Sequence, residues 1–162
     1  MCERFAAASP AGLSVTLPGP TGERNTYTLL PRAAVLCLAQ QEADLATQLA
    51  AVLAAGSQTV WPDSPMARML FARLPKAVQS RVRLVTDWAA GDANFDAVLH
   101  HGDSDQLRAV CEQLATRSGP IISVQGLAHG EPNIAIERLL IERSLSVNTA
   151  AAGGNASLMT IG

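Results

Sequence analysis

Short apolar runs recur along the chain at intervals that suit buried strands. They occupy residues 33–39, 58–61, 81–86, 95–100 and 121–124. Runs of this length and composition are typical of strands. Between several of them, apolar residues return at every third or fourth position, which predicts amphipathic helices. Because the connections are long enough to join parallel neighbours, the pattern predicts an α/β fold with a mostly parallel sheet and flanking helices.

Three helices have recognisable ends. The first carries Glu42 and Asp44 in its first turn, where carboxylates suit the positive end of the helix dipole, and Gly56 is placed to end it. The second begins at Ser64-Pro65, an N-cap followed by proline. The third opens at 103–106 with the spacing of a capping box. We expect the following residues to face the core: Leu45, Leu49, Val52 and Leu53; Met66, Met69, Leu70 and Leu74; Leu107, Val110, Cys111 and Leu114.

The two ends of the chain differ from this rhythm. Residues 1–22 are rich in proline and glycine, so we expect a linker there. Residues 26–30 alternate like a strand, and they could form a hairpin with residues 33–39. The predicted organisation is a linker at 1–22, an α/β domain at 23–137, and an extended β arm with a C-terminal tail at 138–162.

The last nineteen residues, 144–162, contain no charged side chain. Removing their apolar surface from water would contribute roughly 25 cal/mol per Å², so we interpret the segment as one that docks on a protein surface. A flexible tail that happens to lack charge is the alternative. The expected contact residues are Leu145, Val147, Asn148, Thr149, Gly153, Gly154, Asn155, Leu158, Met159 and Ile161.

Composition narrows the classes of function. Hydrophobic residues make up 48% of the 162 residues and charged ones 16%, with a net charge of −2. This balance gives no electrostatic reason to expect nucleic-acid binding. The apolar runs are too short to cross a bilayer, and the Met1 end lacks a signal-peptide pattern, so we expect a cytoplasmic protein without a membrane segment. Three widely spaced cysteines favour reduced thiols and no metal site.

Candidate chemistry is sparse. Gly102 follows a strand and precedes a helix, as in a phosphate-binding turn, but Asp103 and Asp105 would repel an anion there. Adjacent residues on a strand point to opposite faces, so His100 and His101 cannot converge on one ion. No nucleophile, base and oxyanion donor can be assembled, and we expect no catalytic, cofactor-binding or metal-binding residues.

Several segments resemble a known family. TQLAAVLAAGSQTVWP at 47–62, FDAVLHHG at 95–102 and IISVQG at 121–126 resemble the cofactor domain of the aldehyde dehydrogenase superfamily. GERNTYTLLPR at 22–32 and VNTAAAGGNASLMTIG at 147–162 resemble the C-terminal region of the proline utilization A family. That family joins proline dehydrogenase to L-glutamate-γ-semialdehyde dehydrogenase, with FAD and NAD bound in other domains.

The departures from the superfamily pattern bear on function. Trp61 or Pro62 stands where the cofactor lysine is expected, Leu107 replaces the second glycine, and Val124 or Gln125 replaces the glutamate. The resemblance therefore implies a Rossmann-like, non-catalytic domain without its own cofactor. In the family, such a tail packs on the aldehyde dehydrogenase domain, of the same polypeptide or of a dimer mate, and seals the channelling tunnel. An autonomous nucleotide-binding module and a self-association module are the alternatives.

Overall fold

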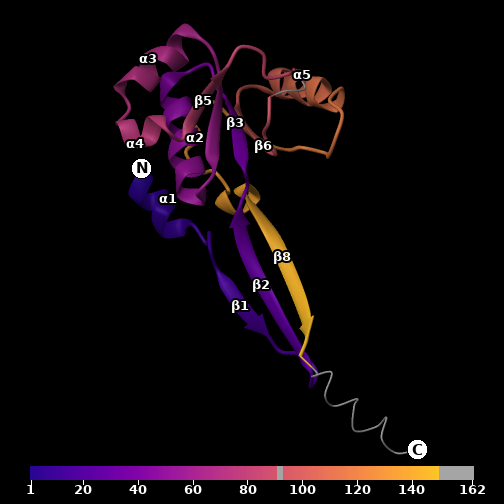
Figure 1. The fold of residues 1–162 in the computed structure, drawn as a ribbon. Helices are drawn as coiled ribbons and strands as arrows, with labels where there is room; N and C mark the ends of the chain where they lie inside the picture. Colours follow the sequence, from indigo (N-terminus) through magenta and orange to yellow (C-terminus); the bar gives the residue numbers. More distant parts are fainter. Residues whose placement is uncertain (91–92, 150–162) are drawn as a thin grey trace, which may run out of the picture.

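The computed structural model describes residues 1–90 and 93–149, which form an α/β body and a long β arm (Figure 1). The body contains a five-stranded sheet, and the arm a three-stranded one. The elements in chain order are α1 (Cys2–Ala8), β1 (Ser14–Leu17), β2 (Glu23–Pro31), β3 (Ala34–Leu38), α2 (Glu42–Ala55), β4 (Gln58–Pro62), α3 (Pro65–Arg73), α4 (Lys76–Gln79), β5 (Val82–Val85), β6 (Ala97–His101), α5 (Ser104–Ala115), β7 (Ser123–Leu127), the 3₁₀ helix η1 (Ile136–Leu139) and β8 (Leu140–Asn148).

The five-stranded sheet has the order β5-β4-β3-β6-β7, and all four pairings are parallel. This is the order of a doubly wound sheet that starts at β3 and reverses direction between β3 and β6. One hydrophobic cluster joins α1, α2 and α3 to one face, with Trp61 fully buried in it. A second cluster, which includes Leu114 of α5, covers the other face. The predicted parallel α/β sheet is confirmed.

The helix ends follow the local sequence signals. Helix α2 runs to Ala55 and is closed by Gly56 at φ 84°, a left-handed conformation that glycine adopts without steric cost. Ser64 caps α3, and its side chain accepts a hydrogen bond from the amide of Ala67 at 3.1 Å. Asp103 and Gln106 form the predicted capping box at the start of α5. All three predictions are confirmed.

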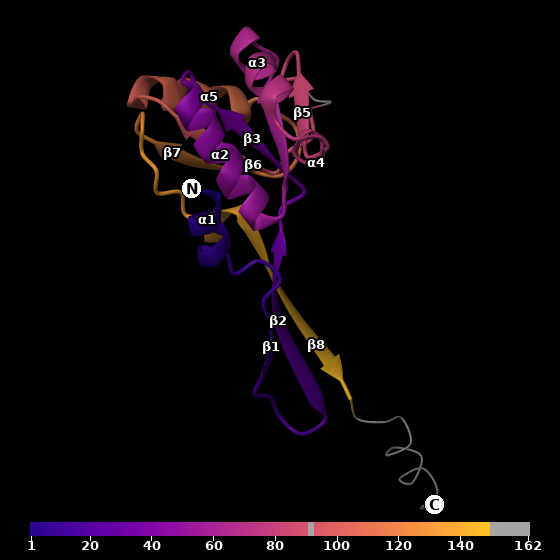
Figure 2. The same cartoon turned by 90° about the vertical axis from the view of Figure 1, so that its left-hand side faces the viewer.

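The arm extends away from the body (Figure 2). Strands β2 and β8 pair antiparallel over nine residues, from Glu23 opposite Asn148 to Pro31 opposite Leu140, and β1 pairs with the other side of β2. The base of the arm is fixed to the body because Leu139 and Leu140 are 1% and 5% exposed. The extended arm predicted at 138–148 is confirmed as a strand over Leu140–Asn148, whereas residues 138 and 139 belong to the 3₁₀ helix η1.

Two expectations about the first forty residues were wrong. Residues 1–22 contain helix α1 and strand β1, because Phe5 is buried against α2 and residues 14–17 pair with β2. Residues 26–30 do not form a hairpin with 33–39. Instead the chain passes from the arm into the parallel sheet at Arg32. Residues 26–28 pair with β1 on one side, and residues 26–30 pair on the other side with β8, more than a hundred residues further along.

Two residues assigned to core-facing helix stripes lie at the surface. Met69 of α3 is 53% exposed, and Cys111 of α5 is exposed as well. Both helices pack along a narrower strip than the sequence pattern predicts, since Leu70 and Ala67 are the buried residues of α3 and Leu114 is the buried residue of α5.

Candidate functional site

Two features of the molecule are candidates for function. The first is the crevice at the carboxyl ends of β3 and β6, where a doubly wound sheet binds its ligand. The second is the arm that leads to the C-terminal tail (Figure 1). The residues that line the crevice bear on the nucleotide-binding hypothesis. The side chains exposed on the arm bear on the docking hypothesis.

The turn between β6 and α5 is filled by side chains. A Cβ atom on Gly102 would collide with the side chains of Gln106 and His100, so there is no open cradle above this glycine. The amide of Gln106 donates to the Asp103 carboxylate at 2.8 Å, and the amide of Asp103 donates to the Gln106 side chain at 3.2 Å. These two amides are therefore already bonded, although a phosphate would need amides of this kind to be free.

A hydrogen-bonded network occupies the side of the crevice next to α2. The side-chain nitrogen Nε2 of Gln48 lies 3.0 Å from the carbonyl oxygen of Leu38 and 2.9 Å from Nδ1 of His101. On the other side of the ring, Nε2 of His101 lies 2.9 Å from the backbone carbonyl oxygen of Glu131. Since a carbonyl can only accept, Nε2 carries the proton and Nδ1 accepts from Gln48. These bonds fix the orientation of the His101 ring between α2 and the loop after β7.

His100 points to the other side of the strand and offers no positive charge. It is 6% exposed, and burial, together with the neighbouring His101, lowers the pKa of His100. Both histidines are buried in the packing around β6.

The crevice does not fit a dinucleotide. Its cavity, of about 340 Å³, is lined by Leu38, Ala39, Gln40, Pro62, Trp88, His100, His101, Gln106, Ala109 and Val110. None of these lining residues is a lysine or an arginine, and no group replaces the missing cation. Of the two candidates for the position of the family's lysine, Trp61 is fully buried and Pro62 has no cation. Val124 and Gln125, the candidates for the glutamate position, lie on β7 and have no carboxylate.

The cysteines do not suggest a nucleophile. Burial raises the pKa of the Cys37 thiol, which keeps it protonated and unreactive. Cys2 and Cys111 are exposed free thiols. Within residues 1–90 and 93–149, no three His, Cys, Asp or Glu side chains are grouped to hold a metal ion.

The arm presents apolar side chains to solvent along its two outer strands, β1 and β8, and at Leu13 just before β1. The exposed fractions are 45% for Leu13, 41% for Val15, 43% for Leu17, 41% for Ile141 and 51% for Leu145. The sheet order β1-β2-β8 leaves one side of β8 without a strand partner among the described residues. An exposed strand edge beside apolar side chains is a typical docking surface for another chain segment.

The two faces of the arm carry opposite charge. Residues that pair directly across antiparallel strands lie on the same face. The pairing register therefore places Glu23 and Glu142 on one face and Arg24 and Arg143 on the other. The apolar residues Val15 and Tyr27 share the acidic face, whereas Leu145 and Val147 share the basic face.

The structure locates four of the ten expected contact residues. Leu145, Val147 and Asn148 lie on β8, and the amide of Thr149, just after it, donates to the carbonyl of Gly22 at 2.7 Å. Gly153, Gly154, Asn155, Leu158, Met159 and Ile161 lie outside the described residues. The exposed apolar residues of β1 were not expected from the sequence, although apolar and polar residues alternate over 13–17.

Comparison with known proteins agrees with these features. The whole chain is 61% identical to the bifunctional protein PutA of Escherichia coli and 62% identical to that of Salmonella typhimurium, over 162 residues in each case. It is 42% identical to PutA of Rhizobium meliloti over 161 residues. The resemblance to proline utilization A is confirmed. The chain spans only 12–13% of the length of these PutA relatives.

Solved structures give the same family and the same fold. A proline utilization A structure from Bradyrhizobium japonicum is 25% identical, with a TM-score of 0.61, over 78% of this chain and 15% of that one. An NAD-dependent benzaldehyde dehydrogenase from Corynebacterium glutamicum shares the fold at 19% identity, with a TM-score of 0.54, over 77% of this chain and 31% of that enzyme. The predicted aldehyde-dehydrogenase-like fold is confirmed. No known family profile matches the chain.

Proposed function

We propose that this chain is a non-catalytic interaction domain of a PutA-type bifunctional oxidoreductase of proline catabolism. The observation that carries the proposal is the similarity of the whole chain to about one eighth of PutA. The catalytic centres, with FAD and NAD, would then lie in the remaining seven eighths. The filled turn at Gly102 supports a role without a cofactor in this domain.

In this proposal the tail packs on the semialdehyde dehydrogenase domain and seals the channelling tunnel. The arm supports it, because Leu145 and Ile141 remain exposed on a strand that leads directly to the uncharged segment. A reactive intermediate passed between two sites needs a wall that excludes water. An uncharged, glycine- and alanine-rich segment could approach another backbone closely and bury its few large side chains. The partner would be that domain of the same polypeptide or of a dimer mate.

The proposal also places the protein in the cytoplasm, in keeping with its three free thiols. No helix in the described ranges, 1–90 and 93–149, is long and apolar enough to span a bilayer.

The test uses the full bifunctional protein with residues 144–162 removed. We expect slower coupled conversion of proline and impaired semialdehyde oxidation, with unchanged proline oxidation at the flavin. A matched control replaces Ser146, an exposed polar residue of β8, by alanine and should behave like the wild type. Full coupled activity in the truncated enzyme would show that the tail is not a lid.

A second candidate function is self-association through the free edge of β8. The unpaired edge and the exposed Leu145 favour it. Sedimentation of the chain with and without residues 144–162 tests this function. Loss of a dimer on truncation supports strand addition, whereas a monomer in both cases eliminates it.

The nucleotide-binding alternative is tested separately by titrating the chain with NAD. We expect no saturable binding at millimolar cofactor, because the crevice lacks a cation and its amides at Asp103 and Gln106 are bonded. Saturable binding that displaces the Gln48–His101 network would overturn the interaction-domain proposal.

A further inference from the structure

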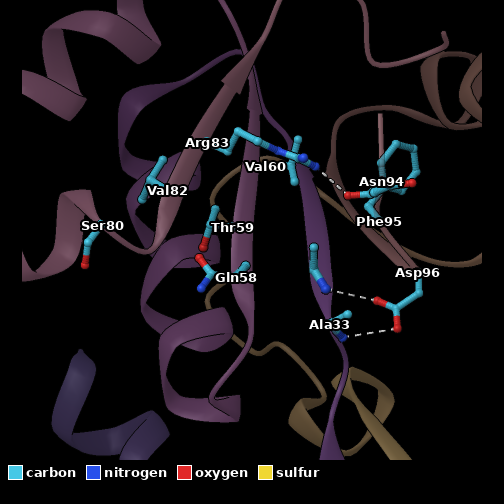
Figure 3. A pocket seen from close by; sticks show the side chains of 11 residues that line it. Ala33, Gln58, Thr59, Val60, Ser80, Val82, Arg83, Asn94, Phe95 and Asp96 are labelled. Atoms are coloured by element: carbon cyan, nitrogen blue, oxygen red, sulfur yellow. Dashed lines mark hydrogen bonds between the residues drawn. The ribbon is translucent and has the colours of Figure 1, made fainter. Parts of the chain in front are cut away.

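One face of the parallel sheet is only partly covered by helix. Helices α1, α2 and α3 pack on the first face, while α5 contributes Val110 and Leu114 to the second. The crossover from β5 to β6 carries no helix in its described part. Beside it, at the amino ends of β3 to β6, a cleft of about 590 Å³ remains open (Figure 3). This is the opposite end of the sheet from the crevice described above.

The walls of the cleft are mostly apolar. Ala34 comes from β3, Val60 from β4, Val82 from β5, and Phe95 from the segment before β6. Val60 and Phe95 are 1% and 8% exposed, so their positions are fixed by the core. The guanidinium of Arg117 lies 4.7 Å from the centre of the Phe95 ring and holds it in place. A volume of this size with apolar walls is typical of small-molecule sites.

One cationic side chain crosses the cleft. Arg83 reaches from β5 past Val60, and its Nη2 donates to the carbonyl oxygen of Asn94 at 2.6 Å (Figure 3). This bond uses one of the five guanidinium donors, and Arg83 has no carboxylate partner among the described residues. The guanidinium is therefore positioned in advance, with donors left for a ligand.

The one carboxylate in the lining already accepts hydrogen bonds from backbone donors. Asp96 accepts from the amides of Ala33 and Ala34 at 3.2 and 3.3 Å, and Figure 3 shows it well apart from Arg83. Arg32 and Arg81 adjoin the lining residues Ala33 and Val82 in the chain, and both bond to backbone carbonyls. With Asp96 bonded to backbone amides, Arg83 is the charged lining residue that has donors left for a ligand, which favours an anion.

We propose that this cleft binds a small amphipathic carboxylate. Its carboxylate accepts hydrogen bonds from Arg83, and its apolar body lies on Ala34, Val60 and Phe95. The site is separate from the tail and from the cofactor crevice, so it goes beyond the interaction role proposed above and can fail or succeed independently of it.

The test titrates the isotopically labelled chain with monomeric octanoate and follows the backbone amide resonances. We expect saturable shifts at Val60, Arg83 and Phe95, and none at Leu38 or His100 on the other edge. Octanol and acetate serve as matched probes that lack the charge or the apolar body. Each should bind at least about tenfold more weakly than octanoate, since each loses one half of the interaction.

Three variants complete the test. Arg83→Gln should weaken octanoate binding by about tenfold or more, as expected for loss of a charge-assisted bond. Ala34→Leu fills the cleft and should abolish binding. Arg108→Gln, an exposed arginine on α5, should change nothing. Binding that survives Arg83→Gln unchanged, shifts confined to the arm, or an absence of saturable shifts in the wild type would each overturn the proposal.

Discussion

Replacing Gln48 with leucine should destabilise the domain strongly, because its side-chain amide satisfies two buried acceptors at once. Gln48 is 0% exposed, and its nitrogen donates to the carbonyl of Leu38 and to Nδ1 of His101. Leucine has a similar size but leaves both acceptors without a donor. An unsatisfied buried acceptor costs about 1–3 kcal/mol. After a small gain from added apolar burial, we expect the free energy of unfolding to fall by about 2–4 kcal/mol.

Urea denaturation followed by tryptophan fluorescence measures this loss, since Trp61 is fully buried and reports on the core. Gln113→Leu is the control. Gln113 lies on the exposed surface of α5, so its replacement should change the unfolding free energy by no more than about 0.5 kcal/mol. An unchanged midpoint for Gln48→Leu, or an equal loss in the control, would refute the assignment of Gln48 as the donor to both groups.

Three further outcomes are expected. The pKa of His100 is lower in the folded state, so the unfolded chain binds more protons, and the free energy of unfolding should fall as the pH drops below the ordinary histidine pKa near 6.5. Urea denaturation at several pH values measures this dependence, and His100→Gln should flatten it. A thiol reagent should modify Cys2 and Cys111 quickly in the folded chain and Cys37 only on unfolding, whereas three equal rates would contradict the burial of Cys37. Asp103→Ala should lower the unfolding free energy by about 1 kcal/mol while Asp103→Ser retains most of it, because serine also caps, and equal losses would argue against the capping role.

Local signals predicted the body of the domain well. Gly56, Ser64 and Asp103 each determine a helix end through their own backbone or side-chain chemistry, so a single sequence is enough to find them. The parallel pairing of the strands could be predicted from the alternation of strand and helix patterns along the chain.

The arm was harder to predict, because its pairing depends on distant residues. Pro31 reads as the turn of a local hairpin, yet its partner is Leu140. Nothing near residues 26–30 specifies a strand more than a hundred positions away. Helix α1 was missed for a related reason, since its one buried side chain, Phe5, is stabilised by packing on α2 rather than by a local signal.

The candidate sites also differ in how far the sequence predicts them. The capping box that fills the turn after Gly102 could be foreseen from the spacing of Asp103 and Gln106 in the sequence. The cleft beside Arg83 could not, because it exists only where the crossover between β5 and β6 leaves the sheet uncovered. Its lining residues come from four separate segments.

The arm also has a mechanical consequence. Nine residues of extended chain place Thr149 roughly 30 Å from the base of the arm. The base is clamped, because Arg32 bonds through its amide and its side chain to the carbonyls of Leu139 and Arg138. A tilt of only about 10° at this anchor would sweep the tip through about 5 Å, roughly the spacing of neighbouring strands. A slight rotation at the base is therefore magnified along the arm into a displacement of several ångströms at its tip.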